Sequence, residues 1–477
     1  MTDATSTKSS ADGWRGVIGD TFTPAYAALV THCVMRALAP AQATGTVLVT
    51  HDGRRDGRRC AAAVVAAATD AGAHRVRLVP HLPTPIASAA LRRGRADVAF
   101  LVTASHNSGR HNGIKVKVPP GRSLPAALEH HAEQLLARTG PVPVGPCAEP
   151  PDHDAATRWT GDHITAVLDR LPAAAGSRRT VVVDGVGGIA GRPMARLCEH
   201  LGWRVHLLGA TPDPDFGGLT PDPTLALTRR RAQDAVRETT ADLGIVLDGD
   251  GDRIFVIDER GRTVQPHELL ALLLRARGAL RRGNPEGGIA VTVATGTAVR
   301  TVARRQGRAV RETPIGFKFL SPLLADGHAD MAGGSVGDLA FADHGIDRDP
   351  FTAVALLAEL LHTTARPLGV LLDELGEEIG RHQWFESRVP AAVLAQDTDF
   401  LRTAGTTALA HAGLAGARPA TTDIDGVKFW LDDDQWMLLR RSTTEAGVRI
   451  YGEVRSTPHS AHRIDQLLTR VRDLLAP

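Results

Sequence analysis

The sequence predicts an α/β protein of several domains, in which three similar domains with parallel or mixed sheets precede an α+β domain. The chain has 477 residues, which exceeds one compact core because domains commonly contain about 100–200 residues. A β-branched run, a turn and an Ala-, Leu- and Arg-rich helical stretch recur along it, as in 46–72, and the rhythm restarts at 179 and 288. Such alternation indicates βαβ units with mainly parallel strands.

Changes in this rhythm divide the chain into four regions. We expect α/β domains at 11–150, 155–262 and 263–375, and an α+β domain at 385–477. The Pro- and Gly-rich stretch 140–154 is typical of a linker. In the last region closely spaced apolar runs indicate antiparallel strands, and the chain closes with an amphipathic helix.

The overall composition is that of an ordinary globular protein. Hydrophobic residues make up 43% of the chain, charged residues make up 23%, and the net charge is +2. A nucleic-acid-binding protein would usually carry a concentrated basic excess. The charge therefore argues against nucleic-acid binding.

Arginine supplies nearly all of the basic residues. Lysine occurs at only five positions, which are 8, 115, 117, 318 and 428. This indicates a coding bias toward arginine, so we assign no function to the pair Arg54 and Arg55. The same bias draws attention to the lysines, although we interpret Lys428 as a solvated residue at a strand edge.

Cysteine usage and hydropathy favour a cytoplasmic protein. The four cysteines are widely spaced and form no CxxC pair, so we expect neither a disulfide framework nor a thiolate metal site. The N-terminus is polar and lacks the apolar segment of a signal peptide. No run of about 18 apolar residues occurs, so we expect a soluble chain without a membrane span.

An acidic loop follows a buried-strand pattern in the second region. After the apolar run 243–247 the chain reads Asp248, Gly249, Asp250, Gly251, Asp252 and Arg253. Glycine permits tight backbone angles between the carboxylates, and three hard oxygen donors so spaced suit Mg²⁺. A Ca²⁺ loop and a solvated acidic turn are the alternatives. An EF-hand would need further acidic positions and a closing glutamate, which this loop lacks.

A candidate nucleophile follows the apolar strand pattern at 98–102 in the first region. Ser105 lies between Ala104 and His106, and Asn107 follows. A serine hydroxyl needs a base or a metal to act as nucleophile or phosphoacceptor, and the GxSxG elbow of hydrolases is absent here. On these residues alone, a turn in which the hydroxyl caps a helix is an equal alternative.

A third polar turn lies between two predicted strands of the last region. It carries Arg440, Arg441 and the hydroxyl residues 442–444, and Arg449 follows on the next strand. Arginine, hydroxyl groups and backbone N–H groups together can cradle a phosphate dianion. An exposed hairpin whose arginine reflects the composition is the alternative.

Seven segments occur in the order found in one enzyme family. They are 12–20 (DGWRGVIGD), 51–54 (HDGR), 83–85 (PTP), 103–107 (TASHN) followed by 112–115 (NGIK), 248–253 (DGDGDR), 312–318 (ETPIGFK) and 440–453 (RRSTTEAGVRIYGE). Together they resemble the opening, phosphoserine, metal, third-domain and phosphate-binding motifs of the α-D-phosphohexomutases, which include phosphoglucomutases and phosphomannomutases. The resemblance covers nearly the whole chain.

The resemblance implies an isomerase that moves phosphate between two hydroxyls of a sugar, with four domains around a central cleft. Ser105 would be a phosphoserine, and Mg²⁺ would be held by Asp248, Asp250, Asp252 and a seryl phosphate oxygen. Phospho-Ser105 would donate to one sugar hydroxyl, giving a bisphosphate that reorients and returns its other phosphate. A bisphosphate of the glucose 1,6-bisphosphate type would serve as activator.

The same resemblance implies roles for further residues. Beside the phosphoserine, acid, base or charge-stabilising groups would be Arg15, His106 and Lys115. Arg253 and Lys318 would line the cleft. The non-reacting phosphate of the substrate would be held in the fourth domain by Arg440, Ser442, Thr444 and Arg449.

The third region departs from the family pattern. Where the family has a sugar-binding loop of the type GEMSGH or GGEESGG, this chain reads GGSVGDLAF at 333–341. The glutamates that would bind adjacent ring hydroxyls are absent, and Ser335 or Asp338 would have to replace them. His344 is a candidate cleft residue, with a structural surface histidine as the alternative. Smaller departures replace a proline, a glycine and a proline of the family by Ser108, Thr443 and Ala446.

The residues for phosphate chemistry are therefore kept, whereas those that select the sugar differ. We expect a phosphosugar other than glucose or mannose phosphate, used in a specialised biosynthetic pathway. A sugar-phosphate phosphatase or another repurposed transfer, and a phosphosugar-binding protein without turnover, are the alternatives. We expect no nucleic-acid or membrane partner, and a monomer or a homodimer.

Overall fold

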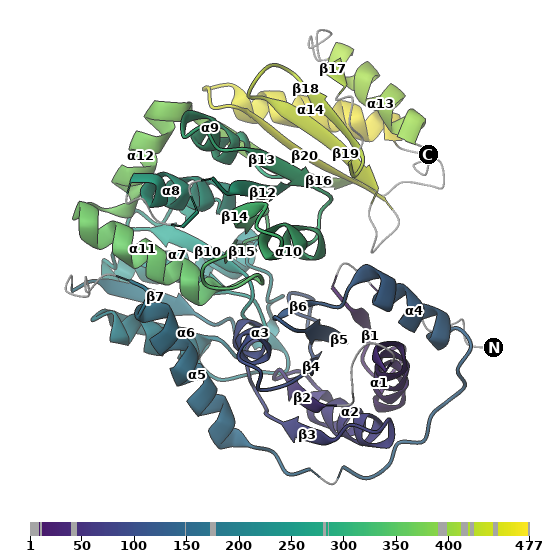
Figure 1. Ribbon diagram of the computed structural model, residues 1–477. Helices are drawn as coiled ribbons and strands as arrows, with labels where there is room; N and C mark the ends of the chain where they lie inside the picture. The colour runs from purple at the N-terminus through teal and green to yellow at the C-terminus, as the bar shows by residue number, and fades with distance from the viewer. Residues whose placement is uncertain are drawn as a thin grey trace.

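The computed structural model of the chain forms four units that follow one another in an arc, from the N-terminal unit at lower right of Figure 1 to the C-terminal unit at upper right. Each unit contains one sheet, and we call the units domains I to IV in chain order. The structure describes residues 9, 12–39, 45–147, 149–171, 178–279, 283–284, 286–389, 398–411, 418–419, 424–441 and 447–475.

Domain I is a mixed sheet with helices on both sides. Its strands are β1 (Trp14–Val17), β2 (Thr46–His51), β3 (Arg75–Leu78), β4 (Val98–Val102), β5 (His111–Val118) and β6 (Arg122–Ser123). Its helices are α1 (Pro24–Leu38), α2 (Gly57–Asp70), α3 (Thr84–Arg92) and α4 (Ala126–Leu136). The strand order is β1-β5-β4-β2-β3, with β6 beside β5. Of the stretch 140–154 predicted as a linker, the described residues 140–147 and 149–152 contain neither helix nor strand, and a helix begins at His153.

Domain II has the same kind of sheet, in the order β11-β10-β9-β7-β8. Its strands are β7 (Thr180–Asp184), β8 (Arg204–Leu208), β9 (Leu243–Leu247), β10 (Ile254–Asp258) and β11 (Thr263–Val264). Its helices are α5 (His153–Leu168), α6 (Gly191–His200), the 3₁₀ turn η1 (Phe216–Gly218) and α7 (Ala226–Thr239). Asp152 begins α5 by accepting a hydrogen bond from the backbone N–H of Ala155, which satisfies a donor of the first turn.

Domain III repeats the arrangement in the order β13-β12-β14-β15. Its strands are β12 (Gly288–Thr292), β13 (Val310–Thr313), β14 (Ala329–Gly333) and β15 (Leu339–Phe341). Its helices are α8 (Pro266–Ala279), α9 (Thr297–Arg305), α10 (Phe317–Ala325), α11 (Pro350–Thr364) and α12 (Leu368–Ile379).

The three sheets share one topology. In each, a central strand lies parallel to both of its neighbours, as β2 lies between β3 and β4, β7 between β8 and β9, and β12 between β13 and β14. In each, the next strand then pairs antiparallel with the last parallel one, as in β4–β5, β9–β10 and β14–β15. The loops between these last pairs therefore occupy equivalent places in the three domains.

Domain IV has a different architecture, in which all strand pairs are antiparallel in the order β16-β20-β19-β18-β17. Its strands are β16 (His382–Val389), β17 (Arg418–Pro419), β18 (Val427–Trp430), β19 (Trp436–Arg441) and β20 (Val448–Arg455), and its helices are α13 (Thr398–His411) and α14 (Ser460–Leu475). The predicted fold class, three mixed-sheet α/β domains followed by an α+β domain, is confirmed.

One apolar core connects the first three domains. It runs from Leu48 and Leu101 of domain I through Val181 and Ile245 of domain II to Phe351 on α11. Removal of this much apolar surface from water is the main force that holds the three domains together. Domain IV has its own core, which includes Phe429 and Ile450.

Lys428 belongs to the contact between domains III and IV, so the interpretation of it as a solvated strand-edge residue is wrong. Its side chain is 3% exposed and donates hydrogen bonds to the Val293 carbonyl at 2.8 Å and to Glu312 at 3.1 Å. Its ammonium lies 4.4 Å from the centre of the Trp436 ring. Burial lowers the Lys428 pKa, and the nearby Glu312 carboxylate opposes that change.

Two further observations concern the cysteines and the helices. The cysteines in the described residues, Cys33, Cys60, Cys147 and Cys198, form no disulfide. Within the described part of the chain, no single helix is long and apolar enough to cross a membrane. The helices α11 and α12, which meet at a sharp bend, are together long and apolar enough by length and composition alone.

Candidate functional site

The three topologically equivalent loops meet at one place. The β4–β5 loop of domain I carries Ser105, the β9–β10 loop of domain II carries the aspartates, and the β14–β15 loop of domain III is the altered sugar loop. The Ile254 N–H donates to the Gly337 carbonyl at 3.0 Å. Gly337 has φ +86°, and a Cβ there would lie 2.3 Å from the Ile254 carbonyl. Only glycine therefore allows these two loops to approach so closely.

Ser105 is fully buried at the junction of domains I and II. Its hydroxyl donates to Asp248 Oδ2 at 2.7 Å, and its backbone N–H donates to the Thr103 hydroxyl at 2.9 Å. Its backbone has φ 53°, a left-handed conformation that costs free energy in a residue other than glycine. The surrounding contacts must supply that free energy and so fix the direction of the hydroxyl.

Arg54 supplies many of these contacts, which contradicts the absence of any function expected for the Arg54 and Arg55 pair. The Arg54 guanidinium is buried and donates to the carbonyls of Ser105 and Asn107 at 2.7 Å each. It also donates to the carbonyls of Ser108 at 2.7 Å and His111 at 2.9 Å. One fixed planar group thus holds the whole serine loop.

Asp52 and Phe216 hold Arg54 in turn. Asp52 Oδ2 accepts from Arg54 Nε at 2.9 Å and from the Thr103 hydroxyl at 2.7 Å. The guanidinium lies 4.7 Å from the centre of the Phe216 ring in domain II. The serine loop is therefore braced from within its own domain and from its neighbour.

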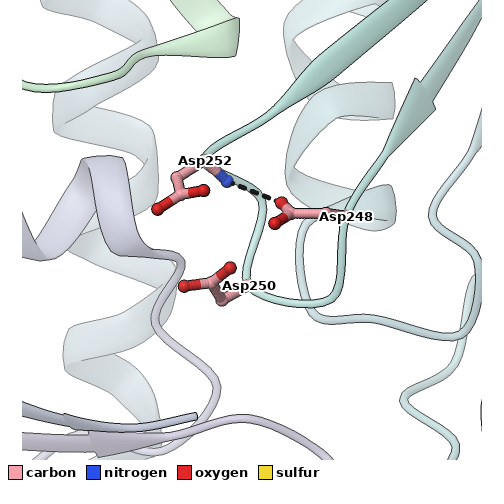
Figure 2. Close-up of side chains that lie close together, drawn as sticks. All are labelled: Asp248, Asp250 and Asp252. Atoms are coloured by element: carbon pink, nitrogen blue, oxygen red, sulfur yellow. Dashed lines mark hydrogen bonds between the residues drawn. The ribbon is translucent and has the colours of Figure 1, made fainter. Parts of the chain in front are cut away.

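The three aspartates of the acidic loop form a compact buried cluster (Figure 2). One oxygen of each of Asp248, Asp250 and Asp252 lies within 4.8 Å of the other two. Asp248 Oδ1 accepts from the backbone N–H groups of Asp252 at 3.0 Å and Arg253 at 3.1 Å, which closes the loop. Burial raises the Asp248 pKa well above its ordinary value, and the neighbouring carboxylates of Asp250 and Asp252 add to the effect.

Lys115 is buried against the same cluster. Its ammonium lies 2.6 Å from Asp250 Oδ2, 2.6 Å from Asp252 Oδ2 and 3.4 Å from Asp12 Oδ2. Burial alone would lower the Lys115 pKa, but the three carboxylates reverse this and raise it. Lys115 is therefore charged at all physiological pH values and balances part of the negative charge of the cluster.

The free oxygens of the cluster fit a metal ion. Among the described residues, Asp250 Oδ1 and Asp252 Oδ1 are buried and have no hydrogen-bond partner, an arrangement that is costly unless a cation or water satisfies them. Carboxylate oxygens at this spacing are the donor set that Mg²⁺ prefers. The residues present thus suit the metal that the sequence predicts.

Three further predicted residues lie in or beside the serine loop. Arg15 donates to the Asn107 side chain at 3.3 Å, and burial lowers its pKa. Within the described residues, the buried His106 Nδ1 and Arg253 Nε have no hydrogen-bond partner. Burial, followed by the positive charges of Arg253 and Arg15, holds the His106 pKa well below its ordinary value, so His106 is neutral.

Both candidate residues of the sugar loop are buried. Ser335 is 6% exposed and Asp338 is 4% exposed. The Asp338 carboxylate turns back onto its own loop, since a Cβ on Gly334 would lie 2.7 Å from Asp338 Oδ1. Asp338 Oδ1 has no hydrogen-bond partner among the described residues. Burial raises the Asp338 pKa, and the charge of Arg253 opposes the shift.

Two other candidates of domain III lie away from the aspartates. Lys318 pairs at 3.1 Å with Glu129 on α4 of domain I. His344 is buried, so the alternative of a surface histidine is wrong, and its Nε2 lies 4.0 Å from Asp343. Burial lowers the His344 pKa to about 4. In the described part of the chain no hydrogen bond or ion pair joins either residue to the acidic cluster.

The predicted phosphate-binding residues of domain IV are described only in part. Arg440 on β19 and Arg449 on β20 are direct neighbours across the sheet. Arg440 pairs with Asp425 at 2.6 Å, and Arg449 pairs with Glu386 at 3.0 Å. Ser442 and Thr444 lie outside the described residues.

Sequence reasoning missed four residues that contact the site directly. Besides Arg54, they are Asp12, Thr84 and Arg348, which touch Lys115, Asp250 and Asp252 respectively. Asp12, Arg54 and Thr84 lie inside motifs that were recognised, at 12–20, 51–54 and 83–85. The sequence pattern had indicated those segments but not which of their side chains enter the site.

Comparison with known proteins agrees with this architecture. Residues 6–141, 162–261 and 265–379 match, in order, alpha/beta/alpha domains I, II and III of phosphoglucomutase/phosphomannomutase. A phosphoglucomutase/phosphomannomutase of Thermococcus kodakarensis is 27% identical over 460 residues, covering 93% of this chain and 94% of the relative. A phosphoglucosamine mutase of Bradyrhizobium diazoefficiens is 30% identical over 371 residues, covering 75% and 79%.

Solved structures support the same fold. A phosphoglucomutase/phosphomannomutase family protein from Burkholderia thailandensis matches with a TM-score of 0.79 at 23% identity, covering 99% of this chain and 98% of that one. The three successive domain matches and the relative at 30% identity show common family membership as well as a shared fold. The chain therefore belongs to the phosphoglucomutase/phosphomannomutase family, a family of phosphohexomutase isomerases.

Proposed function

We propose that this protein interconverts a sugar 1-phosphate and a sugar 6-phosphate, using Ser105 as the carrier of the transferred phosphate. The observation that carries the proposal is the 2.7 Å hydrogen bond from the Ser105 hydroxyl to Asp248 within the buried acidic cluster. Phosphoryl transfer depends on positioning and on charge neutralisation. A fixed hydroxyl between carboxylates and buried cations supplies both.

The acidic cluster would hold Mg²⁺ through Asp248, Asp250 and Asp252, together with an oxygen of phosphorylated Ser105. Bound there, Mg²⁺ would offset the charge of the seryl phosphate and stabilise the negative charge of the transition state. A bisphosphate of the glucose 1,6-bisphosphate type would load the first phosphate onto Ser105. We place the protein in the cytoplasm, where such metabolites occur.

In each transfer the bond between phosphorus and Ser105 Oγ breaks as a sugar hydroxyl oxygen bonds to phosphorus. The sugar hydroxyl proton passes to a base, for which neutral His106 with its unpartnered Nδ1 is suited. The freed Ser105 oxygen keeps the electron pair of the broken bond and receives one proton, which balances the proton lost by the sugar hydroxyl; the restored Ser105 hydroxyl then donates to Asp248 as it does in this structure. Reversal of these steps at the other hydroxyl returns the second phosphate of the bisphosphate to Ser105. The cations of Arg15 and Lys115 offset charge on the moving phosphate.

The other end of the substrate would bind in domain IV. Arg440 and Arg449 lie side by side on adjacent strands, and a guanidinium binds phosphate in a bidentate manner. Ser442 and Thr444 would complete this site with their hydroxyl groups. Arg253 and Lys318 would line the space between the two phosphate sites.

The sugar itself would differ from glucose or mannose. Ser335 has a short side chain, and the Asp338 carboxylate turns toward Gly334 of its own loop. A charged hydrogen bond contributes about 1.5–3 kcal/mol, so loss of both glutamates weakens the grip on two ring hydroxyls. An amino, deoxy or otherwise altered sugar phosphate in a specialised biosynthetic pathway is the substrate class that this loop would favour.

A panel of sugar 1-phosphates, followed by ³¹P NMR with Mg²⁺ and the matching bisphosphate, tests this function. We expect conversion to the 6-phosphate, fastest for a sugar that lacks an ordinary hydroxyl at one ring position. A clear preference for glucose 1-phosphate would contradict the altered-sugar proposal. Release of inorganic phosphate without isomer would instead indicate a phosphatase, which weaker enclosure of the sugar could allow. Asp338→Asn, which keeps the size of the side chain, would change the order of preference if Asp338 contacts the sugar.

A further inference from the structure

Arg348 joins three domains at the acidic cluster. It lies in the segment between β15 and α11 of domain III and is 3% exposed. Its Nη2 lies 2.9 Å from Asp252 Oδ2 in domain II, and the same nitrogen pairs with Asp12 Oδ2 in domain I. The guanidinium lies 5.4 Å from the centre of the Phe317 ring. A single buried cation thus contacts an aspartate of the proposed metal site.

The contacts of the cluster divide its oxygens into two classes. Asp252 Oδ2 is held by both Lys115, at 2.6 Å, and Arg348. Asp250 Oδ2 is held by Lys115, at 2.6 Å, and by the Thr84 hydroxyl, at 2.7 Å. In both residues the other oxygen, Oδ1, is buried and has no hydrogen-bond partner among the described residues. Each carboxylate therefore offers one free oxygen and has one oxygen already occupied.

Arg348 is itself fixed, so it can hold an oxygen in place. The adjacent Asp347 accepts from the Ser88 hydroxyl at 2.7 Å and pairs with the buried Lys117 at 2.7 Å. Both partners belong to domain I, on α3 and β5. The segment that carries Arg348 is thus tied to the same domain that supplies Asp12.

We infer that Arg348 is a positioning residue that, together with Lys115, restricts Asp252 to coordination through one oxygen and thereby selects Mg²⁺ over Ca²⁺. Mg²⁺ requires near-octahedral geometry with short bonds, which carboxylates satisfy with single oxygens. Ca²⁺ is larger, takes six to eight oxygens and accepts both oxygens of one carboxylate. Arg348 shares Asp252 Oδ2 with Lys115, and the two cations together occupy an oxygen that Ca²⁺ can use as a second ligand and Mg²⁺ does not need. The inference rests on the proposed metal site at this cluster.

The ratio of the affinities for Ca²⁺ and Mg²⁺ separates the effect of coordination geometry from the effect of electrostatic attraction. Removal of a cation beside the site changes the electrostatic attraction of Mg²⁺ and Ca²⁺ alike, because both ions carry two positive charges. A change in the number of oxygens that Asp252 offers affects the two ions unequally. The ratio of dissociation constants for Ca²⁺ and Mg²⁺ therefore reports geometry.

The experiment measures both dissociation constants by isothermal titration of the full, metal-stripped chain with MgCl₂ and with CaCl₂. In Arg348→Met we expect the preference for Mg²⁺ over Ca²⁺ to fall by about 10-fold, the size of effect found for residues that orient metal ligands. Arg348→Lys keeps the charge but lacks the planar fork, so its preference should fall several-fold without a change in charge. This second variant also serves if Arg348→Met does not fold.

Arg277→Met is the matched control, because it removes a buried arginine of domain III that pairs with Asp330 and Asp343 and with none of the three aspartates. The ratio of its Ca²⁺ and Mg²⁺ dissociation constants should equal that of the wild type. An unchanged ratio in the Arg348 variants would overturn the inference while leaving the metal site intact. A wild-type chain that binds neither ion would overturn the metal site and the inference together.

Discussion

Arg54 Nη2 donates to the carbonyl oxygen of Ser105 at 2.7 Å, across 51 positions of sequence. The same guanidinium binds three further carbonyls of the serine loop and the Asp52 carboxylate. Ser105 has a left-handed backbone conformation, which a loop without such support would relax. The direction of the Ser105 hydroxyl toward Asp248 thus depends on a residue that never reaches the acidic cluster.

Replacement of Arg54 by Met should destabilise the protein by about 3 kcal/mol or more, because it leaves a buried carboxylate and several carbonyls without their donor. Turnover should fall as well, since Ser105 loses its fixed position. Urea unfolding and a mutase assay measure the two effects. Arg55→Met is the matched control, because the Arg55 side chain is 63% exposed, and its effect should stay within about 0.5 kcal/mol. Equal effects of the two substitutions would contradict the role of Arg54.

Lys115 should matter more for stability than the metal does. Lys115→Met would leave Asp250 without a cationic partner and would leave Asp252 and Asp12 to Arg348 alone, which should cost about 3–5 kcal/mol. Removal of Mg²⁺ by EDTA should abolish turnover but lower the melting temperature only slightly, because Lys115 and Arg348 still balance the aspartates. Differential scanning calorimetry with and without EDTA measures this. Unfolding of the wild type by EDTA would contradict the account.

His344 should make stability depend on pH. Its pKa is about 4 in the folded chain and near 6.5 when exposed, so between these values only the unfolded state binds the proton. Its contribution is fully present above pH 6.5 and is lost as the pH falls toward 4. From pH 7 to pH 5 the wild type should lose roughly 2 kcal/mol more than His344→Gln, measured by urea unfolding. An equal loss in both proteins would show that His344 is protonated in the folded state.

Lys428 should couple domains III and IV. Lys428→Met removes its hydrogen bonds to Val293 and Glu312, although Arg300 still pairs with Glu312. We expect a loss of about 1–3 kcal/mol, in the range for an unsatisfied buried group, with earlier unfolding of domain IV. Tryptophan fluorescence reports this, since Trp436 packs against Lys428. The exposed Arg311 on β13 provides the control, as Arg311→Met. A variant of Lys428 as stable as the control would contradict the coupling.

The fold could be predicted from the sequence because each α/β domain has a local sequence pattern of strand followed by helix. Runs such as 46–51, 180–184 and 288–292 are apolar, and a helix follows each within a few residues, so the period of the pattern identifies them without long-range information. The change of architecture in domain IV was visible for the same reason. The contact between the three equivalent loops could not be predicted in this way, because it depends on the order of the strands in each sheet and on how the domains pack, which no local pattern contains.

The candidate site was predictable where its residues are neighbours in sequence. The aspartates at 248–252 and the serine at 105 each belong to a short segment of recognisable chemistry. Arg54 and Arg348 contact the site from distant segments, and in an arginine-rich chain neither stands out by composition. Lys428 was misinterpreted because strand alternation shows that a face is polar but not that another domain covers it.

Transfer of phosphate through Ser105 is the central claim, and mass spectrometry of the loaded enzyme tests it most directly. The full chain would be incubated with a sugar 1,6-bisphosphate and Mg²⁺, freed of ligand and digested, and the peptide that contains Ser105 analysed before and after addition of a sugar monophosphate. We predict one phosphate on Ser105 that disappears as bisphosphate forms, and no phosphate in Ser105→Ala. Isomerisation at an unchanged rate in Ser105→Ala, or a phosphate on another residue, would contradict the account.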